Sequence, residues 1–172
     1  IAADELTAYT VARRGYDARK RGAIVLIYTL DVDTPREPEL LQRLQRDPDA
    51  LGGKVAPTPD TTYTFVATAP ARLPLRPLVV GMGPCGLFAG LVLAQMGFRP
   101  IILERGKAVR ERTVDTFGLW RKKILDPESN VQFGEGGAGT FSDGKLHSQI
   151  SDKQHHGRKV LREFVAAGAP EE

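Results

Sequence analysis

The residues best suited to chemistry in this sequence are three glycines and one acid within residues 78–104. Gly81, Gly83 and Gly86 follow a short apolar run in the spacing G-x-G-x-x-G. With this spacing a backbone turn approaches the pyrophosphate of a dinucleotide at the N-terminus of a helix. Glu104 ends the next apolar run, where a carboxylate accepts hydrogen bonds from ribose hydroxyls and repels a 2′-phosphate. The stretch therefore predicts a dinucleotide site that disfavours NADP.

A strand, turn, helix and second strand must position this site, and each glycine has its own task. We expect Gly81 to permit the tight turn, Gly83 to leave room for the pyrophosphate, and Gly86 to let the helix pack against the sheet. Pro84 and Cys85 lie inside the same turn and are predicted to line the cofactor. Because the chain has one cysteine, we interpret Cys85 as a small packing residue rather than a redox group.

Length and composition are those of an ordinary globular protein. The 172 residues suffice for one domain or two small ones, and the net charge of +3 does not by itself indicate a nucleic-acid partner. A single cysteine fits a reducing compartment, so we expect a cytoplasmic protein, and no apolar run is long enough to predict a membrane span. The chain begins at Ile1 and ends in AGAPEE, from which we expect a fragment cut at both ends.

The sequence predicts two domains of different type. Residues 71–76 lie in a proline-rich stretch that is typical of an extended linker. Residues 1–70 are predicted to form a small α+β domain. Residues 77–172 are predicted to form the N-terminal part of an α/β, Rossmann-like dinucleotide-binding domain.

The small domain has a recognisable order of elements. A strand begins within residues 6–11, a β-rich run covers residues 23–32, a short helix covers residues 39–45, and alternating residues 61–68 predict a half-buried strand. This order fits half of a ferredoxin-like domain that lacks its first strand and helix.

Basic residues gather in both halves of the chain. The cluster at residues 12–22 is open to two interpretations, a phosphate or RNA contact and a solvated hairpin, and we favour the hairpin because no aromatic stacking motif accompanies it. In the second half, Arg105 and Arg112 are candidates to neutralise a pyrophosphate. Arg112 falls in a predicted helix whose buried side would consist of Val109, Phe117, Trp120 and Ile124.

A second glycine-rich loop occupies residues 129–146. Its glycines allow close approach of backbone to a ligand, and the candidate ligand-binding residues are Gly136, Gly137, Thr140, Ser142 and Lys145. The Walker A spacing is absent because Leu146 follows Lys145. Asp143 and Lys145 are the nearest candidates for acid–base chemistry, whereas His147, His155 and His156 do not form a convincing metal-binding pattern.

The segments VVGMGPCGLFAGLVLAQMGFRPIILERG, DPESNVQFGEGGAGTFSDGKL and GYDARKRGAIVLIYTLDV carry a family resemblance. Together they resemble the uncharacterised FAD-dependent dehydrogenases of bacteria, which are predicted NAD(P)/FAD-dependent oxidoreductases of much greater length. The resemblance implies FAD at Gly81, Gly83, Gly86 and Glu104, with the second loop near the cofactor and NAD(P)H as a reductant of the intact protein. It implies no particular substrate.

Three alternatives stay open at this point. The same fold and the same acid suit an NAD-binding oxidoreductase, the basic N-terminal region suits a non-catalytic module that binds RNA or a protein partner, and a truncated product without activity is the third. An incomplete sheet leaves an open edge and apolar surface. We therefore expect this chain to self-associate when it is produced alone.

Overall fold

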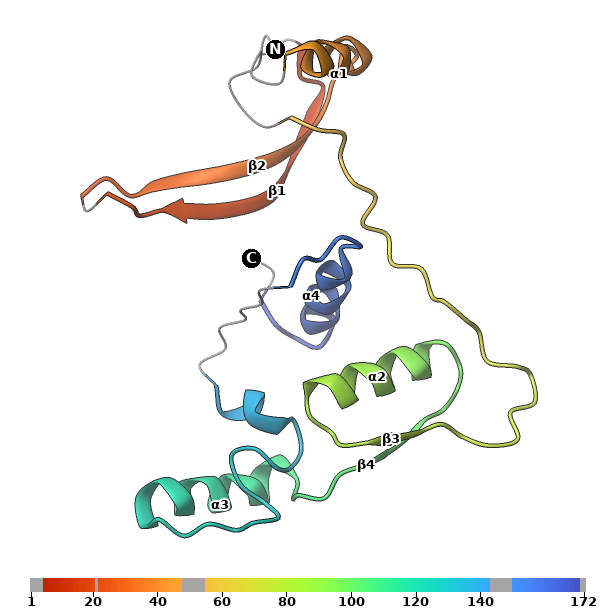
Figure 1. Ribbon diagram of the computed structural model, residues 1–172, viewed down its shortest axis with the longest axis vertical. Helices are drawn as coiled ribbons and strands as arrows, with labels where there is room; N and C mark the ends of the chain where they lie inside the picture. Colours follow the sequence, from red (N-terminus) through yellow and green to blue (C-terminus); the bar gives the residue numbers. More distant parts are fainter. Residues whose placement is uncertain (1–4, 21, 48–54, 143–149, 171–172) are drawn as a thin grey trace. The chain divides into compact units, whose positions relative to one another are not determined.

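The computed structural model describes residues 5–20, 22–47, 55–142 and 150–170, and the chain forms two compact units, Ile1–Thr61 and Thr62–Glu172 (Figure 1). The chain is mixed α/β, and each unit contains one two-stranded sheet within the residues described. Among the helices of these residues, none has the length and apolar character needed to cross a membrane.

The first unit is a β-hairpin followed by a helix. Strand β1 (Ala8–Asp17) pairs antiparallel with β2 (Val25–Asp33), and α1 (Glu37–Arg46) begins after a short turn. The acidic first turn and the basic last turn of α1 suit the helix dipole, and Leu40 on this helix is buried. The predicted strand at residues 23–32 and the predicted helix at residues 39–45 are confirmed.

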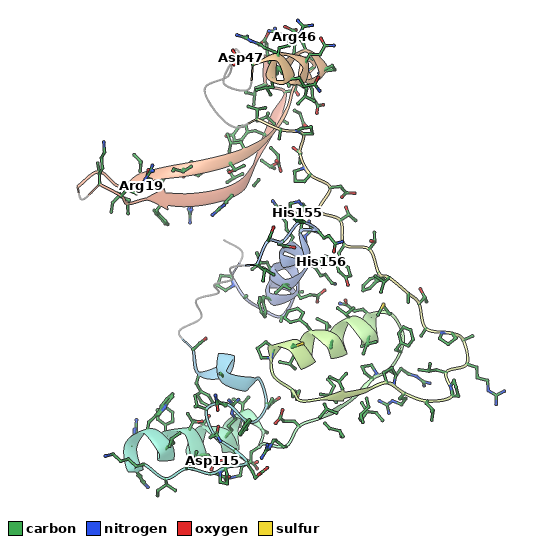
Figure 2. The ribbon with its side chains drawn as sticks, in the orientation of Figure 1. Arg19, Arg46, Asp47, Asp115, His155 and His156 are labelled. Atoms are coloured by element: carbon green, nitrogen blue, oxygen red, sulfur yellow. The ribbon has the colours of Figure 1, made fainter. Side chains whose placement is uncertain are left out.

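The described residues of the basic cluster lie on this hairpin. Arg19 is near the end of the hairpin (Figure 2), where its guanidinium donates to both carboxylate oxygens of Asp17 at 2.8 and 2.5 Å. This hydrogen bonding holds the pKa of Asp17 below its usual range. One of the five basic residues of the cluster is thus neutralised by a neighbouring acid, as in the hairpin interpretation.

The second unit contains the predicted strand–turn–helix–strand arrangement. Strand β3 (Leu78–Val80) leads into α2 (Pro84–Gln95), and β4 (Ile101–Leu103) then pairs parallel with β3. The arrangement is confirmed by the register, in which Val80 lies opposite Leu103. Both strands therefore end at the same edge of the sheet, next to the first glycine turn.

Close packing of α2 on the turn and sheet explains two glycines. A Cβ atom on Gly86 would lie 1.9 Å from the carbonyl oxygen of Gly81, and one on Gly90 would lie 2.5 Å from Cδ1 of Ile102 in β4. A side chain at Gly86 would require the helix to move, whereas one at Gly90 would require at least the Ile102 side chain to shift. Gly86 thus has the packing role that the sequence predicts.

Two further helices follow β4, with a short 3₁₀ helix (Gly137–Phe141) between them: α3 (Val109–Lys122) and α4 (His156–Ala166). The predicted buried side of α3 is wrong. Phe117, Trp120 and Ile124 are at least 39% exposed, whereas Arg112 and Thr116 are the buried residues of this helix. Arg112 lies on the side of α3 that packs against the second glycine loop, whose carbonyl groups require hydrogen-bond donors rather than apolar side chains.

The segment before β3 is extended rather than a strand. The predicted strand at residues 61–68 is wrong, because this stretch forms no ladder with any described residue and Val66 is 90% exposed. Tyr63 instead contacts His156 at the start of α4, with ring centroids 5.7 Å apart. The expected linker, residues 71–76, lies in the second unit, where Arg76 donates to the carbonyl oxygen of Arg99 at 2.6 Å.

Apolar side chains are unusually exposed in both units. Of the described residues, Leu40 and Met96 are the only buried hydrophobic ones, and large apolar side chains such as Tyr16, Val80 and Ile150 are at least 70% exposed. Exposed apolar surface of this kind favours association. The expected self-association of the chain stays a prediction.

Candidate functional site

The first glycine turn connects the end of β3 to the start of α2. Gly81 takes a φ of +99°, and its N–H donates to the carbonyl oxygen of Leu103 at 2.7 Å, which joins the turn to the end of β4. Gly83 is the residue that precedes the first turn of α2, and no side chain caps the helix there. The first N–H groups of a helix have no partner within the helix, so this end is suited to an anionic group.

Glu104 lies immediately after β4 and connects the turn to the chain beyond it. Its Oε2 accepts the N–H of Met82 at 2.7 Å, and its Oε1 accepts the N–H of Gly106 at 2.9 Å. These backbone donors, Gly106 above all, hold the pKa of Glu104 below its usual range. The sequence predicts that this carboxylate binds a ribose, but it does not reveal that the carboxylate also holds two backbone turns in place.

The second glycine loop folds against the first glycine turn. The N–H of Gly136 donates to the carbonyl oxygen of Met82 at 2.9 Å. A Cβ atom on Gly137 would lie 3.1 Å from both Cα of Gly83 and Cδ of Pro84, which shows how closely the two backbones approach. The two glycine-rich segments, fifty residues apart in the sequence, therefore form one continuous backbone surface.

Arg112 fixes the shape of the second loop. Its side chain is completely buried, and its five N–H donors face five acceptors on the loop. The acceptors are the carbonyl oxygens of Asn130 (2.7 Å), Val131 (2.8 Å), Gly137 (2.5 Å) and Glu135, and Oγ1 of Thr140 (3.4 Å). Burial lowers the pKa of Arg112, and the nearby carboxylates of Glu104 and Glu135 oppose that shift.

This placement differs from the expectation for Arg112. The sequence predicts a guanidinium that neutralises a pyrophosphate, whereas the structure directs all of its N–H groups to loop acceptors. The signal for this role is weak in the sequence, because the acceptors are mostly backbone carbonyl groups that any residue supplies. In the structure Arg112 is a positioning residue for the loop.

Arg105 is also held by protein groups. Its guanidinium donates to both carboxylate oxygens of Glu128, at 2.9 and 2.5 Å, and lies 4.6 Å from the centre of the Phe133 ring. The ion pair raises the pKa of Arg105. The side chain is half exposed, so it remains beside the cavity described next rather than inside the protein.

A cavity of about 440 Å³ lies at the ends of β3 and β4. The sequence predicts half of its walls, namely Gly81, Gly83, Glu104, Arg105 and Gly137. It misses the other half, which consists of Val80, Leu103, Gln132, Phe133 and Gly134. Val80 and Leu103 were identifiable as the last residues of parallel strands, since ligands of such sheets bind beyond those ends.

The remaining predicted site residues lie elsewhere or outside the described residues. Gly86 lies beneath the turn, and Thr140 donates to the carbonyl oxygen of Glu135 at 3.1 Å within the second loop. Ser142 is exposed at the end of the 3₁₀ helix. Lys145 and Asp143, like His147, fall outside the described residues.

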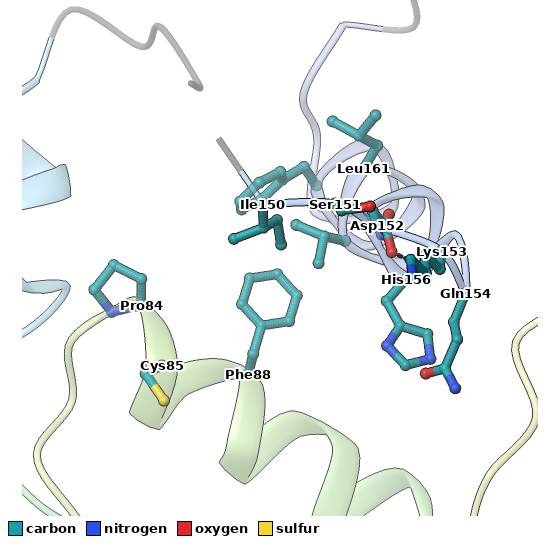
Figure 3. A pocket seen from close by; sticks show the side chains of 13 residues that line it. Pro84, Cys85, Phe88, Ile150, Ser151, Asp152, Lys153, Gln154, His156 and Leu161 are labelled. Atoms are coloured by element: carbon teal, nitrogen blue, oxygen red, sulfur yellow. Dashed lines mark hydrogen bonds between the residues drawn. The ribbon is translucent and has the colours of Figure 1, made fainter. Parts of the chain in front are cut away.

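Pro84 and Cys85 line a different cavity, which has a volume of about 1030 Å³ and lies between α2 and α4 (Figure 3). Phe88 of α2 and Phe164 of α4 meet edge to face in its wall, with ring centroids 5.6 Å apart. Sequence reasoning misses this cavity, because it depends on how α4 packs against α2. In the described part of the chain no group of three or more His, Cys, Asp or Glu side chains is placed to hold a metal ion.

Comparison with known proteins relates the chain to a longer, uncharacterized protein. No family model matches the chain. The chain is 39% identical over 169 residues to an uncharacterized protein of Clostridium beijerinckii (strain ATCC 51743 / NCIMB 8052), and the match covers 98% of this chain. It covers 30% of that relative, so the chain spans less than a third of the length of the protein it matches.

Proposed function

We propose that residues 62–172 form the ADP-binding part of an FAD site in a cytoplasmic, flavin-dependent oxidoreductase that acts on a small-molecule substrate. One observation carries the proposal, namely the cavity at the ends of β3 and β4, which is bordered by both glycine segments and by Glu104. Ligands of parallel sheets bind at this position, beyond the carboxyl ends of the strands.

The residues present fit the pyrophosphate and ribose of a dinucleotide. A Cβ atom on Gly83 would meet Gly137 Cα at 3.9 Å, an ordinary van der Waals contact, and Gly83 lines the cavity at the strand ends. The N–H groups of Cys85 and Gly86 belong to the first turn of α2, where helix donors have no helical partners. The positive end of the helix dipole adds a favourable interaction with phosphate.

Glu104 is suited to hold a ribose and the two turns together. Its carboxylate accepts the N–H groups of Met82 and Gly106, and the backbone N–H groups of Arg105 and Gly134 also stabilise its charged form. Its low pKa keeps the carboxylate charged at neutral pH, so it is an acceptor for a ribose hydroxyl and repels a 2′-phosphate. FAD, when bound, supplies the hydride chemistry, for which NAD(P)H is the proposed reductant in the intact protein.

Two features favour FAD over NAD. The second glycine loop lies against the first turn through Gly136 and Met82, which adds a second backbone wall to the site. The segments of that loop and of the turn also carry the resemblance to FAD-dependent dehydrogenases. An NAD site needs only the strand–turn–helix–strand arrangement and the acid, which leaves the loop unexplained.

The proposal is tested by the visible absorbance of the purified chain and by titration of its flavin-free form with FAD. Gly83→Val places a side chain where the pyrophosphate would lie, and Glu104→Ala removes the ribose acceptor. We expect each variant to weaken FAD binding by at least about tenfold. We expect ADP to compete with FAD, and NAD to compete poorly.

Matched controls separate a loss of binding from a loss of folding. Gly118 lies in α3 with no atom within 4 Å of an added Cβ, so Gly118→Ala is the control for the glycine variant. Glu111→Ala, also on α3 and exposed, is the control for the acid. A folded parent chain that binds neither FAD nor ADP contradicts the proposal, and one that prefers NAD supports the NAD-binding alternative.

A further inference from the structure

We propose that the cavity between α2 and α4 holds the isoalloxazine ring of the flavin whose ADP half occupies the cavity at the strand ends. The inference rests on the proposed function, and it assigns a binding role to α4, to Phe88 and to Cys85. Of its wall, the glycine motif of the sequence indicates only Pro84 and Cys85. The cavity is recognised from the position, size and chemistry of its walls.

The two cavities adjoin the same helix terminus. Gly83 lines the cavity at the strand ends, and Pro84, the next residue, lines the cavity between the helices. The two cavities therefore meet the chain at consecutive residues, Gly83 and Pro84, on both of which Gly137 of the second loop packs. Two half-sites next to one phosphate site suit a ligand with a nucleotide at one end and a second ring system at the other.

The walls of this cavity suit a planar aromatic ring. Phe88 projects from α2 towards Ile150 (Figure 3), and Val160, Leu161 and Phe164 line the cavity from α4. The volume of about 1030 Å³ is that of a cavity for a small organic molecule. Rings of this kind bind between apolar and aromatic side chains, with a few polar groups at the margin to fix their orientation.

The polar margin contains charged groups of both signs, Asp152 and Lys153, and is compatible with the polar edge of a neutral ring. Asp152 accepts the N–H groups of His156 and Gly157 at 2.9 and 2.7 Å, so it already caps the start of α4 with a negative charge. These backbone bonds lower the pKa of Asp152. The side chains of Ser151, Gln154 and Lys153 complete this margin and supply hydrogen-bonding groups for the polar edge of a ring.

Polar contacts also hold α4 against α2. Nε2 of Gln95, at the end of α2, donates to Oε1 of Glu163 at 3.0 Å, and Nζ of Lys159 donates to Oε1 of Gln95 at 2.9 Å. Together with the contact between Phe88 and Phe164, these bonds join the two helices that form the walls. The two helices that bound the cavity are therefore in direct contact with each other.

The test compares FAD with ADP on the full chain. Val160→Trp fills the cavity from α4, while Val114→Trp places the same side chain on α3, where Val114 is 72% exposed and lines neither cavity. We expect Val160→Trp to weaken FAD binding by about tenfold or more while ADP affinity changes less than about twofold. We expect the control to change neither affinity. Equal effects of Val160→Trp on FAD and ADP, or no effect on either, overturn the inference.

Cys85 supplies a second readout that needs no substitution. It is the only cysteine of the chain, it is exposed, and it lines this cavity. We expect FAD to slow the reaction of its thiol with a maleimide by about tenfold more than ADP does, because only FAD carries the ring. Equal protection by FAD and ADP overturns the inference even if Val160→Trp fails to fold.

The outcomes distinguish this inference from the proposed function. If the parent chain binds ADP and FAD but the ring does not protect Cys85, the proposed function stands and the cavity has another occupant. If the parent binds neither nucleotide, the proposed function fails and the inference fails with it. Protection of Cys85 by the apolar dye anilinonaphthalenesulfonate but not by lumiflavin assigns the cavity to an apolar substrate and also overturns the inference.

Discussion

The first glycine turn and the second glycine loop border the same cavity, but their glycines serve different purposes. In the first turn, Gly86 is needed because α2 packs directly on the carbonyl group of Gly81. In the second loop, the backbone conformation is held from outside by one buried cation, Arg112, which donates to acceptors at residues 130–140. A short motif thus forms the turn by local packing, whereas the loop depends on a residue from a different element.

The largest effect is expected from a variant that disrupts the first turn. In Gly86→Ala, the new Cβ would lie 1.9 Å from a backbone oxygen, so α2 must move away from the turn. We expect a loss of about 3 kcal/mol in the free energy of unfolding, measured by urea denaturation. The second loop should suffer only indirectly.

Gly118→Ala is the control for this variant, because an added Cβ there meets nothing within 4 Å and alanine favours a helix. We expect it to be neutral or to stabilise the chain by up to about 1 kcal/mol. If Gly86→Ala is as stable as Gly118→Ala, close packing is not what the first turn requires.

A smaller effect is expected in the second loop, from Arg112→Lys. Lysine keeps the charge but has three donors on a single nitrogen, so it leaves some loop acceptors without partners. We expect a loss of about 2 kcal/mol and faster hydrogen exchange in the loop, with little change in the N–H groups of α2. Hydrogen exchange measured by mass spectrometry separates these two regions.

Arg110→Lys is the matched control, since Arg110 lies on the same helix and is exposed. The comparison between turn and loop fails if Arg112→Lys opens α2 as much as it opens the loop. If Arg110→Lys also opens α2 as much as the loop, the change results from the helix rather than from the loop contacts.

The difference between the turn and the loop also explains which parts of the structure the sequence could predict. The strands, the turn and α2 were predictable, because glycine spacing and apolar runs record requirements that arise within a few residues. The role of Arg112 was not, because the carbonyl groups that it binds carry no side-chain signature. For the same reason the apolar residues of α3 were expected inside, although a polar loop covers the opposite side of that helix.

Two other errors have a similar cause. Residues 61–68 have the alternation of a strand, but a strand also requires a partner edge, and alternation does not say whether one is present. The cavity between α2 and α4 depends on a packing arrangement of elements sixty residues apart. Of the candidate site, the sequence thus predicts the backbone that faces a phosphate, but not the residues that support or surround it.

The smallest expected effect concerns Glu104, which accepts the N–H of Met82 in the first turn and also interacts with the backbone N–H of Gly134 in the second loop. Its pKa is lower in the folded chain than in the unfolded chain, so its contribution to stability is fully present above the unfolded pKa and disappears as pH falls through the folded pKa. Glu104→Gln should therefore cost about 1 kcal/mol at pH 7 and progressively less in acid.

Urea denaturation of the parent, of Glu104→Gln and of Glu111→Gln between neutral and acid pH measures this difference. Glu111 is exposed on α3, so we expect its variant to follow the parent over this range. Combining Glu104→Gln with Arg112→Lys then asks whether the turn and the loop are stabilised independently. Additive losses mean that Glu104 serves mainly the first turn, whereas a combined loss smaller than the sum means that the carboxylate acts on the turn through the loop that Arg112 holds.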